Sequence, residues 1–179
     1  MKKSEPWRVR SSPIHGRGVF AIRTIRKGAK IIEYRGARIS ESAANDRPAR
    51  DPKNPYHTFL FQLSDGTIID GGARGNSARW INHSCQPNCE SVEYDDGTLF
   101  IHARRTIRAG EELCYDYRIA RLGRSSKSDR EAYACACKSP RCRGTLLLTA
   151  KSHRRWVPPI ADYLVLMGEE GSHEATADS

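Results

Sequence analysis

The chain has 179 residues, 38% of them hydrophobic and 28% charged, a balance typical of one soluble globular domain with a small appendage. No apolar run approaches the roughly 20 residues that cross a bilayer, and the start MKKSEPWRVRSS lacks the apolar core of a secretory signal. We therefore expect an intracellular protein with no membrane partner, in a reducing compartment where its six cysteines are thiols or metal ligands. The net charge of +9 favours nucleic acid or another acidic partner.

The first residues of the chain are not expected to contribute to a hydrophobic core. Residues 1–13 are expected to be a lead-in, followed by a Gly-x-Gly turn at Gly16 and Gly18 that runs into an apolar, strand-like segment. Two glycines at this spacing permit close approach of the backbone to a ligand. From the spacing alone, a hairpin turn is the favoured interpretation.

Short elements and an exposed loop are predicted next. The apolar run 31–34 predicts a strand, and 40–45 predicts a short helix with Ser40 as its N-cap. The stretch 47–55 is rich in proline and charge, which predicts an exposed insertion.

Two hairpins and a further strand are predicted in the central region. β-rich segments flank the turns Ser-Asp-Gly-Thr and Asp-Asp-Gly, whose residues favour tight reversals. Many short strands with almost no helical periodicity predict a mostly β fold. The segments are 56–63 and 68–70 around the turn 64–67, 91–94 and 98–101 around the turn 95–97, and the strand 111–117.

The C-terminal third changes composition several times. A basic, serine-rich stretch predicts a flexible linker, three cysteines follow within eight residues, and the last dozen residues are polar and expected to be disordered. A short helix is predicted over 160–167. The expected organisation is a lead-in at 1–13, a main domain at 14–120, a linker at 121–133, a zinc segment at 134–150 and an extension at 151–179.

The densest concentration of polar and metal-competent side chains is the stretch RWINHSCQPNCE, residues 79–90. Pro87 and the asparagine and serine content disfavour a regular helix or a central strand. We interpret the stretch as a fixed polar loop that builds a site, with a turn carrying two incidental cysteines as the alternative.

Cys135, Cys137 and Cys142 form the pattern C-x-C-x4-C. Structural zinc takes four tetrahedral ligands and favours thiolates, so this pattern predicts a zinc site that lacks one ligand. The spacing leaves three candidates for the fourth ligand: Cys85, Cys89 and Cys114.

Together, these motifs resemble the SET-domain family of protein-lysine methyltransferases. The resemblance covers residues 15–144 and is most specific in the Asn-His-Ser-Cys-x-Pro-Asn string and the post-SET cysteines. It implies a mostly β SET fold, in which small sheets surround a pseudoknot, with a C-terminal zinc-binding post-SET segment. The matching motifs are His15–Ala21, Glu33–Gly36, Gly75–Asn76, Arg79–Cys89, Gly110–Tyr117 and Cys135–Gly144.

The resemblance also implies roles for single residues. The family binds S-adenosyl-L-methionine, releases S-adenosyl-L-homocysteine, and receives the target lysine through a narrow channel. On the matching positions, the catalytic channel residues are Tyr117, Tyr115 and Tyr34; the cofactor-binding residues are Arg17, Gly18, Asn82, His83 and Leu146 (or Leu147); and the ligands of one zinc ion are Cys85, Cys135, Cys137 and Cys142.

Methyl transfer requires a neutral amine, although a free lysine has a pKa near 10.4. An apolar, aromatic channel would lower that pKa by desolvation and fix the line of attack. A tyrosine at Tyr115 favours lower methylation states by resemblance. Tyr117 would be a poor base, since the usual tyrosine pKa is near 10, so positioning is its expected role.

Cys89 and Cys114 are expected to be buried free thiols.

The leading hypothesis is therefore an S-adenosylmethionine-dependent methyltransferase that acts on a lysine-bearing protein or peptide, with a histone or histone-like protein as one candidate. The alternative is a catalytically silent, zinc-clipped SET-like module that binds nucleic acid or chromatin-like partners. The lack of a cysteine-rich region before residue 14 makes the chain resemble minimal bacterial or viral SET proteins, which would place it in the cytoplasm. A eukaryotic or host-delivered protein would act at nuclear chromatin. The oligomeric state and the substrate protein are left open.

Overall fold

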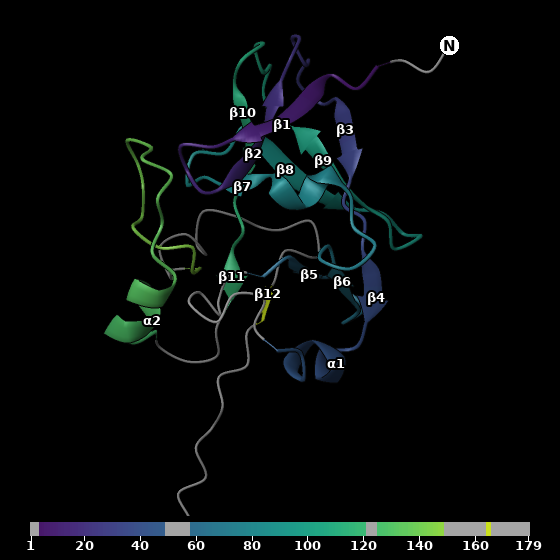
Figure 1. Cartoon of the computed structure of the whole chain (residues 1–179), viewed down its shortest axis with the longest axis vertical. Helices are drawn as coiled ribbons and strands as arrows, with labels where there is room; N and C mark the ends of the chain where they lie inside the picture. The colour runs from purple at the N-terminus through teal and green to yellow at the C-terminus, as the bar shows by residue number, and fades with distance from the viewer. Residues whose placement is uncertain (1–3, 49–57, 121–124, 149–163, 166–179) are drawn as a thin grey trace, which may run out of the picture.

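The structure is a computed structural model that describes residues 4–48, 58–120, 125–148 and 164–165 (Figure 1). Most of the expected insertion at 47–55 and the polar end of the chain lie outside these residues. Within them the chain forms three small sheets and one two-stranded pair, so the mostly β prediction is confirmed. None of the described helices is long and apolar enough to cross a membrane.

The largest sheet has the strand order β1–β2–β10–β7. β1 and β2 pair antiparallel, β10 adds antiparallel to β2, and β7 pairs parallel with β10. This last pairing brings together the segments 82–83 and 114–115, which lie far apart in the sequence. The four strands are β1 Trp7–Ser11, β2 Arg17–Ala21, β10 Glu112–Tyr115 and β7 Asn82–His83.

Two three-stranded antiparallel sheets complete the main domain. Their hairpins confirm the predicted turns at 64–67 and 95–97. Their orders are β3–β9–β8, from Lys30–Glu33, Leu99–Ala103 and Cys89–Glu93, and β4–β6–β5, from Ala37–Ile39, Ile68–Asp70 and Leu60–Gln62.

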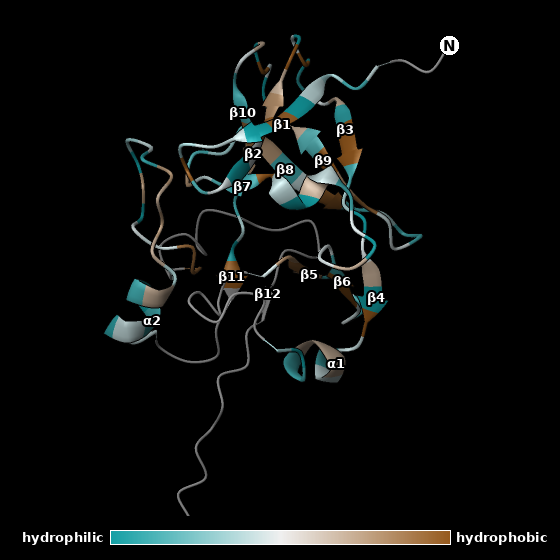
Figure 2. Cartoon of the chain, in the orientation of Figure 1, coloured by the Kyte–Doolittle hydropathy of each residue, from teal (hydrophilic) through white to brown (hydrophobic). Residues whose placement is uncertain are grey.

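The helices are short and peripheral (Figure 1). α1 spans Glu41–Asn45 and α2 spans Lys127–Ala132, and neither contains a buried residue. In Figure 2 hydrophobic colour is clear on strands such as β3 and β11 (Ile119–Ala120). Ser40 caps α1 as predicted, by accepting a hydrogen bond from the backbone of Ala43. The 3-10 helix η1, Ser77–Trp80, leads directly into β7.

Three local expectations differ from the structure. β1 lies inside the stretch expected to be a lead-in, because Trp7 is buried and its strand pairs with β2 over five residues. α2 lies inside the expected linker and is held by a capping box between Ser126 and Asp129. In the predicted helix at 160–167, the described residues Leu164–Val165 form strand β12, which pairs parallel with β11, Ile119–Ala120.

Buried side chains form one main core and one satellite. The main core includes side chains from β2, β6, β9 and β10, and Val19, Leu99, Ile101 and Leu113 are fully buried in it. The satellite contains Ile119, Tyr133 and Leu147. It therefore attaches the C-terminal segment 133–148 to the main domain directly after β10.

Candidate active site and metal centre

Four cysteines meet at the junction of the main domain and the C-terminal segment. The sulfur atoms of Cys85, Cys135, Cys137 and Cys142 all lie within 4.8 Å of one another. Zinc–thiolate bonds of about 2.3 Å in a tetrahedron place sulfurs roughly 3.8 Å apart, and Cys85 Sγ lies 3.8 Å from that of Cys135 and 4.0 Å from that of Cys142. The four residues therefore fit one tetrahedral zinc ion.

Cys85 is the cysteine from the main domain that joins this cluster. Cys89 and Cys114, the other candidates from the spacing, are buried free thiols, and burial raises the pKa of Cys89 to about 12. Such thiols stay protonated at neutral pH. The expectation that they are buried free thiols is confirmed.

Backbone N–H groups surround the sulfur atoms. The N–H of Cys85 lies 3.5 Å from Cys137 Sγ, and the N–H of Arg143 lies 3.4 Å from Cys85 Sγ. Burial alone raises the pKa of Cys137, but donors such as Cys85 N–H and the Ser139 hydroxyl outweigh it and lower that pKa to about 6. Burial raises the pKa of Cys85 to about 11 and also raises that of Cys135. Cys137 is therefore the readiest thiolate of these three, and a bound metal ion would have to displace protons from the other two.

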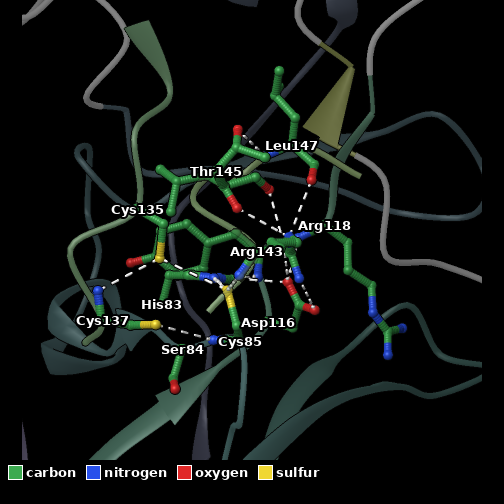
Figure 3. Close-up of polar contacts among 12 residues, drawn as sticks. His83, Ser84, Cys85, Asp116, Arg118, Cys135, Cys137, Arg143, Thr145 and Leu147 are labelled. Carbon is green, nitrogen blue, oxygen red and sulfur yellow. Dashed lines mark hydrogen bonds and ion pairs between the residues drawn. The ribbon is translucent and has the colours of Figure 1, made fainter. Parts of the chain in front are cut away.

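Arg143 fastens the C-terminal segment to the end of β10 (Figure 3). Its guanidinium donates two hydrogen bonds to the Asp116 carboxylate, at 2.7 and 2.6 Å, and further hydrogen bonds to the carbonyls of Thr145, Leu146 and Leu147. The two charged side chains are only 14% and 16% exposed. Burial raises the pKa of Asp116, but the Arg143 guanidinium outweighs it and holds that pKa below its ordinary value.

His83 connects the cysteine cluster with the segment that carries Tyr117. Its Nδ1 accepts a hydrogen bond from the Tyr117 backbone N–H at 3.0 Å, and its Nε2 lies 3.3 Å from Cys85 Sγ. A neutral imidazole that accepts at Nδ1 carries its proton on Nε2, so this ring donates to the sulfur. Burial lowers the pKa of His83 to about 4, which keeps the ring neutral at physiological pH.

Aromatic rings form a continuous series beside the cysteine cluster. The ring centroids of Tyr34 and Phe61 lie 5.5 Å apart, those of Phe61 and Tyr115 lie 6.2 Å apart, and those of Tyr115 and Tyr117 lie 4.9 Å apart. Tyr117 also contacts His83 edge to face. The three predicted channel tyrosines therefore lie in one aromatic wall.

The hydroxyl groups of Tyr34 and Tyr117 are held by backbone carbonyls. Tyr117 Oη donates to Ile81 at 2.9 Å, and Tyr34 Oη donates to Phe59 at 2.9 Å. Burial raises the pKa of both hydroxyls well above the ordinary tyrosine value. Each hydroxyl is therefore neutral and oriented, with its oxygen lone pairs left to accept a hydrogen bond.

A cavity runs along this aromatic wall and beneath the C-terminal segment. Its floor comes from β7 and the end of β10, and the segment from α2 to the first zinc ligand closes one side. It is lined by Ile14, His15, Tyr34, Thr58, Phe59, Leu60, Arg79, Asn82, His83, Tyr115, Tyr117, Ile119, Ala132, Tyr133, Ala134, Cys135, Ala136 and Leu146.

The predicted cofactor residues divide into two groups. Asn82, His83 and Leu146 line the cavity, whereas Arg17 and Gly18 do not. Arg17 is exposed, with its guanidinium 5.0 Å from the centre of the Trp80 ring. Gly18 is buried, and a Cβ there would press on the Glu112 carboxylate and on Ser12, so a larger residue would displace the Glu112 side chain that Asn82 contacts.

Asn82 ties the turn before β2 to the strands beside the cavity. Its side-chain nitrogen donates to the carbonyls of His15 and Arg17, at 3.2 and 2.9 Å, and to Glu112 Oε1 at 2.8 Å. The Gly-x-Gly turn is thereby placed against β7, and Ile14 and His15 reach the cavity from it.

Some residues of the site were not found from the sequence. Arg143 and Asp116 carried a signal, since both stand inside quoted motifs, but their pairing depends on the folded tail. Tyr133 follows α2 and lines the cavity together with Ala134 and Ala136. No local pattern distinguished Tyr133 from the other residues of the expected linker at 121–133, and Ala134 and Ala136 stood in the expected zinc segment only as neighbours of the cysteines.

Comparison with known proteins identifies the family of the chain. The profile of the SET-domain family matches residues 16–118. The chain therefore belongs to the SET-domain family, and the resemblance inferred from the motifs is confirmed.

Its curated relatives are histone-lysine methyltransferases by name. The H3 lysine-4 specific enzyme of Saccharomyces cerevisiae is 38% identical over 149 residues, which are 81% of this chain and 13% of the yeast protein. Histone-lysine N-methyltransferase set1 of Dictyostelium discoideum is 40% identical over 139 residues, 75% of this chain and 9% of that protein. Trithorax of Drosophila virilis is 37% identical over 135 residues, 74% of this chain and 3% of that protein. The chain thus spans a small part of the length of these relatives.

Proposed function

We propose that this chain is an S-adenosyl-L-methionine-dependent protein-lysine N-methyltransferase. The observation that carries the proposal is the cavity in which Tyr34, Tyr115 and Tyr117 form one aromatic wall beside Asn82 and His83. An aromatic wall with few, fixed polar atoms suits the desolvated amine that methyl transfer requires. The family match and the names of the relatives support the same reaction class.

The bound cofactor would supply an electrophilic methyl group on a sulfonium. The chain's own contribution is to orient the lysine amine and to exclude water from it. Tyr117 Oη, fixed by its hydrogen bond to Ile81, would accept a hydrogen bond from the amine and direct its lone pair. With its pKa raised by burial, Tyr117 would act as a positioning group rather than as a base. Tyr115, whose ring packs on that of Tyr117, would restrict the space around the amine and favour lower methylation states.

The residues that would hold the cofactor are Asn82, His83 and Leu146, together with Ile14 and His15 from the preceding turn. Arg17 and Gly18 would contribute indirectly. Gly18 permits the close packing of β2 on Glu112, and Arg17 offers a carbonyl that Asn82 holds.

One zinc ion held by Cys85, Cys135, Cys137 and Cys142 would have a structural role. Four thiolates leave no open coordination position for a substrate. The ion would instead fix the C-terminal segment, with Tyr133 and Leu146, over the cavity.

The substrate we propose is a lysine of a protein, with histone H3 as the first candidate because the yeast relative is named for it. A nuclear location would follow from such a substrate. The rival function, a binding module without turnover, predicts cofactor or zinc binding with no transfer.

The test compares the wild-type chain with Tyr117→Phe and with the control Tyr94→Phe, using labelled S-adenosyl-L-methionine and histone H3 or a lysine-rich protein extract. Tyr94 is 37% exposed and stands outside the cavity. Transfer by Tyr117→Phe should fall by about tenfold or more, since 1.4 kcal/mol of lost orientation is a factor of ten, whereas Tyr94→Phe should retain it. Cofactor binding without label transfer to any protein would refute the enzyme and favour the binding module.

A further inference from the structure

A six-residue motif occurs twice in the chain, at positions that the structure brings together. The sequence Arg-Thr-Ile-Arg-x-Gly stands at 23–28 and again at 105–110. One residue separates each copy from a buried alanine that precedes it. The two eight-residue stretches 21–28 and 103–110 show the same order of burial: one buried residue, three exposed, one buried, three exposed.

The two copies pair with each other across a local two-fold axis. Ile25 and Ile107 exchange two backbone hydrogen bonds, at 2.8 and 2.9 Å. The N–H of Gly28 donates to Ala103, and the N–H of Gly110 donates to Ala21, at 2.7 and 2.8 Å. Both glycines have positive φ, 78° and 90°. Since Ile25 and Ile107 are buried, the two paired turns form one rigid unit rather than two independent loops.

The exposed side of the two paired turns, residues 21–28 and 103–111, carries a concentration of positive charge. We call it the twin-turn surface. Its only acidic residue within 21–28 and 103–111 is Glu111. The cations of the twin-turn surface, all exposed, are Arg23, Arg26, Lys27, Arg104, Arg105 and Arg108.

Three of these six cations make ion pairs or hydrogen bonds through their side chains. Arg105 pairs with Glu111 at 2.6 Å, and Arg104 lies 3.8 Å from Glu90. Arg23 donates to the carbonyl and hydroxyl of Ser4. For the remaining three, Arg26, Lys27 and Arg108, the described part of the chain provides no ion pair within 4 Å and no side-chain hydrogen bond, although the Arg108 charge contributes to the lowered pKa of Glu111.

The twin-turn surface is separate from the candidate active site. The two turns project at the top of Figure 1, at the far end from β11 and α2. None of their residues lines the cavity. A partner bound there would leave the cavity and the C-terminal segment accessible.

We propose that the twin-turn surface binds the phosphate backbone of double-stranded nucleic acid without sequence preference. Five of its six cations are arginines, whose planar guanidinium matches phosphate with two parallel hydrogen bonds. A duplex has local two-fold axes that relate the phosphates of its two strands, and Arg23/Arg105 and Arg26/Arg108 stand at equivalent positions of the two paired copies of the motif.

The same surface suits other polyanions less well. It contains no aromatic residue on which the bases of a single strand would stack. Its one exposed large apolar side chain, Ile22, falls short of the apolar face that inserts into a membrane. The excess of positive charge over the whole chain adds long-range attraction.

The proposal is independent of methyl transfer and is tested by binding alone. The full chain, loaded with zinc, is titrated into a labelled duplex of mixed sequence, about 20 base pairs long, at several salt concentrations, and anisotropy is measured. The test variant is Arg26→Gln/Arg108→Gln, and the matched control is Lys127→Gln/Arg130→Gln on α2, which removes the same charge elsewhere on the exposed surface.

The test variant should bind roughly 10- to 100-fold more weakly at low salt, and the slope of log K against log salt should become shallower by about 2, about one for each lost phosphate contact. The control should change little. Arg26→Lys/Arg108→Lys keeps the charge and should retain the slope. If the Gln double variant fails to fold, Arg108→Gln alone should lose about one unit of slope.

Three results would overturn the proposal. Equal losses in the test variant and the control would show that net charge alone attracts the duplex. Unchanged binding in the test variant would place any nucleic-acid contact elsewhere. Preferential binding to a single strand of equal length, or to vesicles that contain anionic lipid, would assign the surface to a different partner.

Discussion

The ion pair between Arg143 and Asp116 is expected to be one of the most sensitive points of the fold. The change that tests it is Arg143→Met, which keeps much of the side-chain volume and removes the charge. Asp116 would then be a carboxylate with only 16% of its side chain exposed and without its bidentate partner. Breaking a buried pair on one side typically costs about 3–5 kcal/mol, because a buried charge is left uncompensated.

The size of the expected effect can be set against an exposed pair in the same chain. Arg105 and Glu111 have side chains that are 54% and 31% exposed, with the same 2.6 Å separation between their closest atoms. Arg105→Met should cost only about 0–1 kcal/mol, since solvent screens such a pair. In a chain of this length 1 kcal/mol corresponds to about 2–4 °C in Tm, so Arg143→Met should lower Tm by about 6–20 °C.

The pH dependence of this loss has a defined sign. In the wild-type chain the pKa of Asp116 lies below its ordinary value, so its stabilisation is present above the unfolded pKa near 3.9 and is lost as pH falls through the lowered pKa. Without Arg143, burial raises the pKa of Asp116. The variant should therefore recover stability as pH falls from neutrality through that raised pKa.

The assay is thermal unfolding by calorimetry of four chains, namely wild type, Arg143→Met, Arg143→Met/Asp116→Asn and Arg105→Met, with zinc and reductant held constant. The double variant should be more stable than Arg143→Met, because neutral Asn carries no uncompensated charge. If Arg143→Met unfolds within about 2 °C of Arg105→Met, or if the double variant is no better than the single one, the pair does not act as a buried clamp.

The remaining predictions concern the metal and the threading of β10. Metal analysis should find about one zinc ion per chain, lost in Cys142→Ser and kept in Cys89→Ala; zinc retained by Cys142→Ser would contradict the ligand set. Asn88→Ala should destabilise the chain by about 2–3 kcal/mol in denaturant titrations, because the buried side chain donates to Glu112 at 2.8 Å and accepts from the Cys114 N–H at 2.9 Å. A loss under about 0.5 kcal/mol would show that water replaces both bonds.

Features encoded within a few residues were predictable from the sequence. The reversals at 64–67 and 95–97 and the cap at Ser40 depend on local hydrogen bonds and on glycine's freedom at positive φ. The capping box of α2 was equally local, with Ser126 and Asp129 at the required spacing, and it was overlooked because the surrounding residues are basic and polar.

The motifs also determined the family and the chemical character of the site. The Asn-His-Ser-Cys string and the three C-terminal cysteines were sufficient to predict a zinc site and a SET domain. They left the fourth ligand open on spacing alone. Cys85, Cys89 and Cys114 are the same residue type, and a linear sequence contains no distance between residues fifty positions apart.

The family resemblance pointed to Cys85, and the tertiary structure supplies the physical reason for that choice. Parallel pairing of β7 with β10 buries Cys114, pairing of β8 with β9 buries Cys89, and Cys85 is left to face the C-terminal segment. The same pairing sets Tyr117 on His83. These contacts join residues that lie tens of positions apart, so each must offset a loop-closure entropy, and the site is a property of the assembled sheets rather than of any one motif.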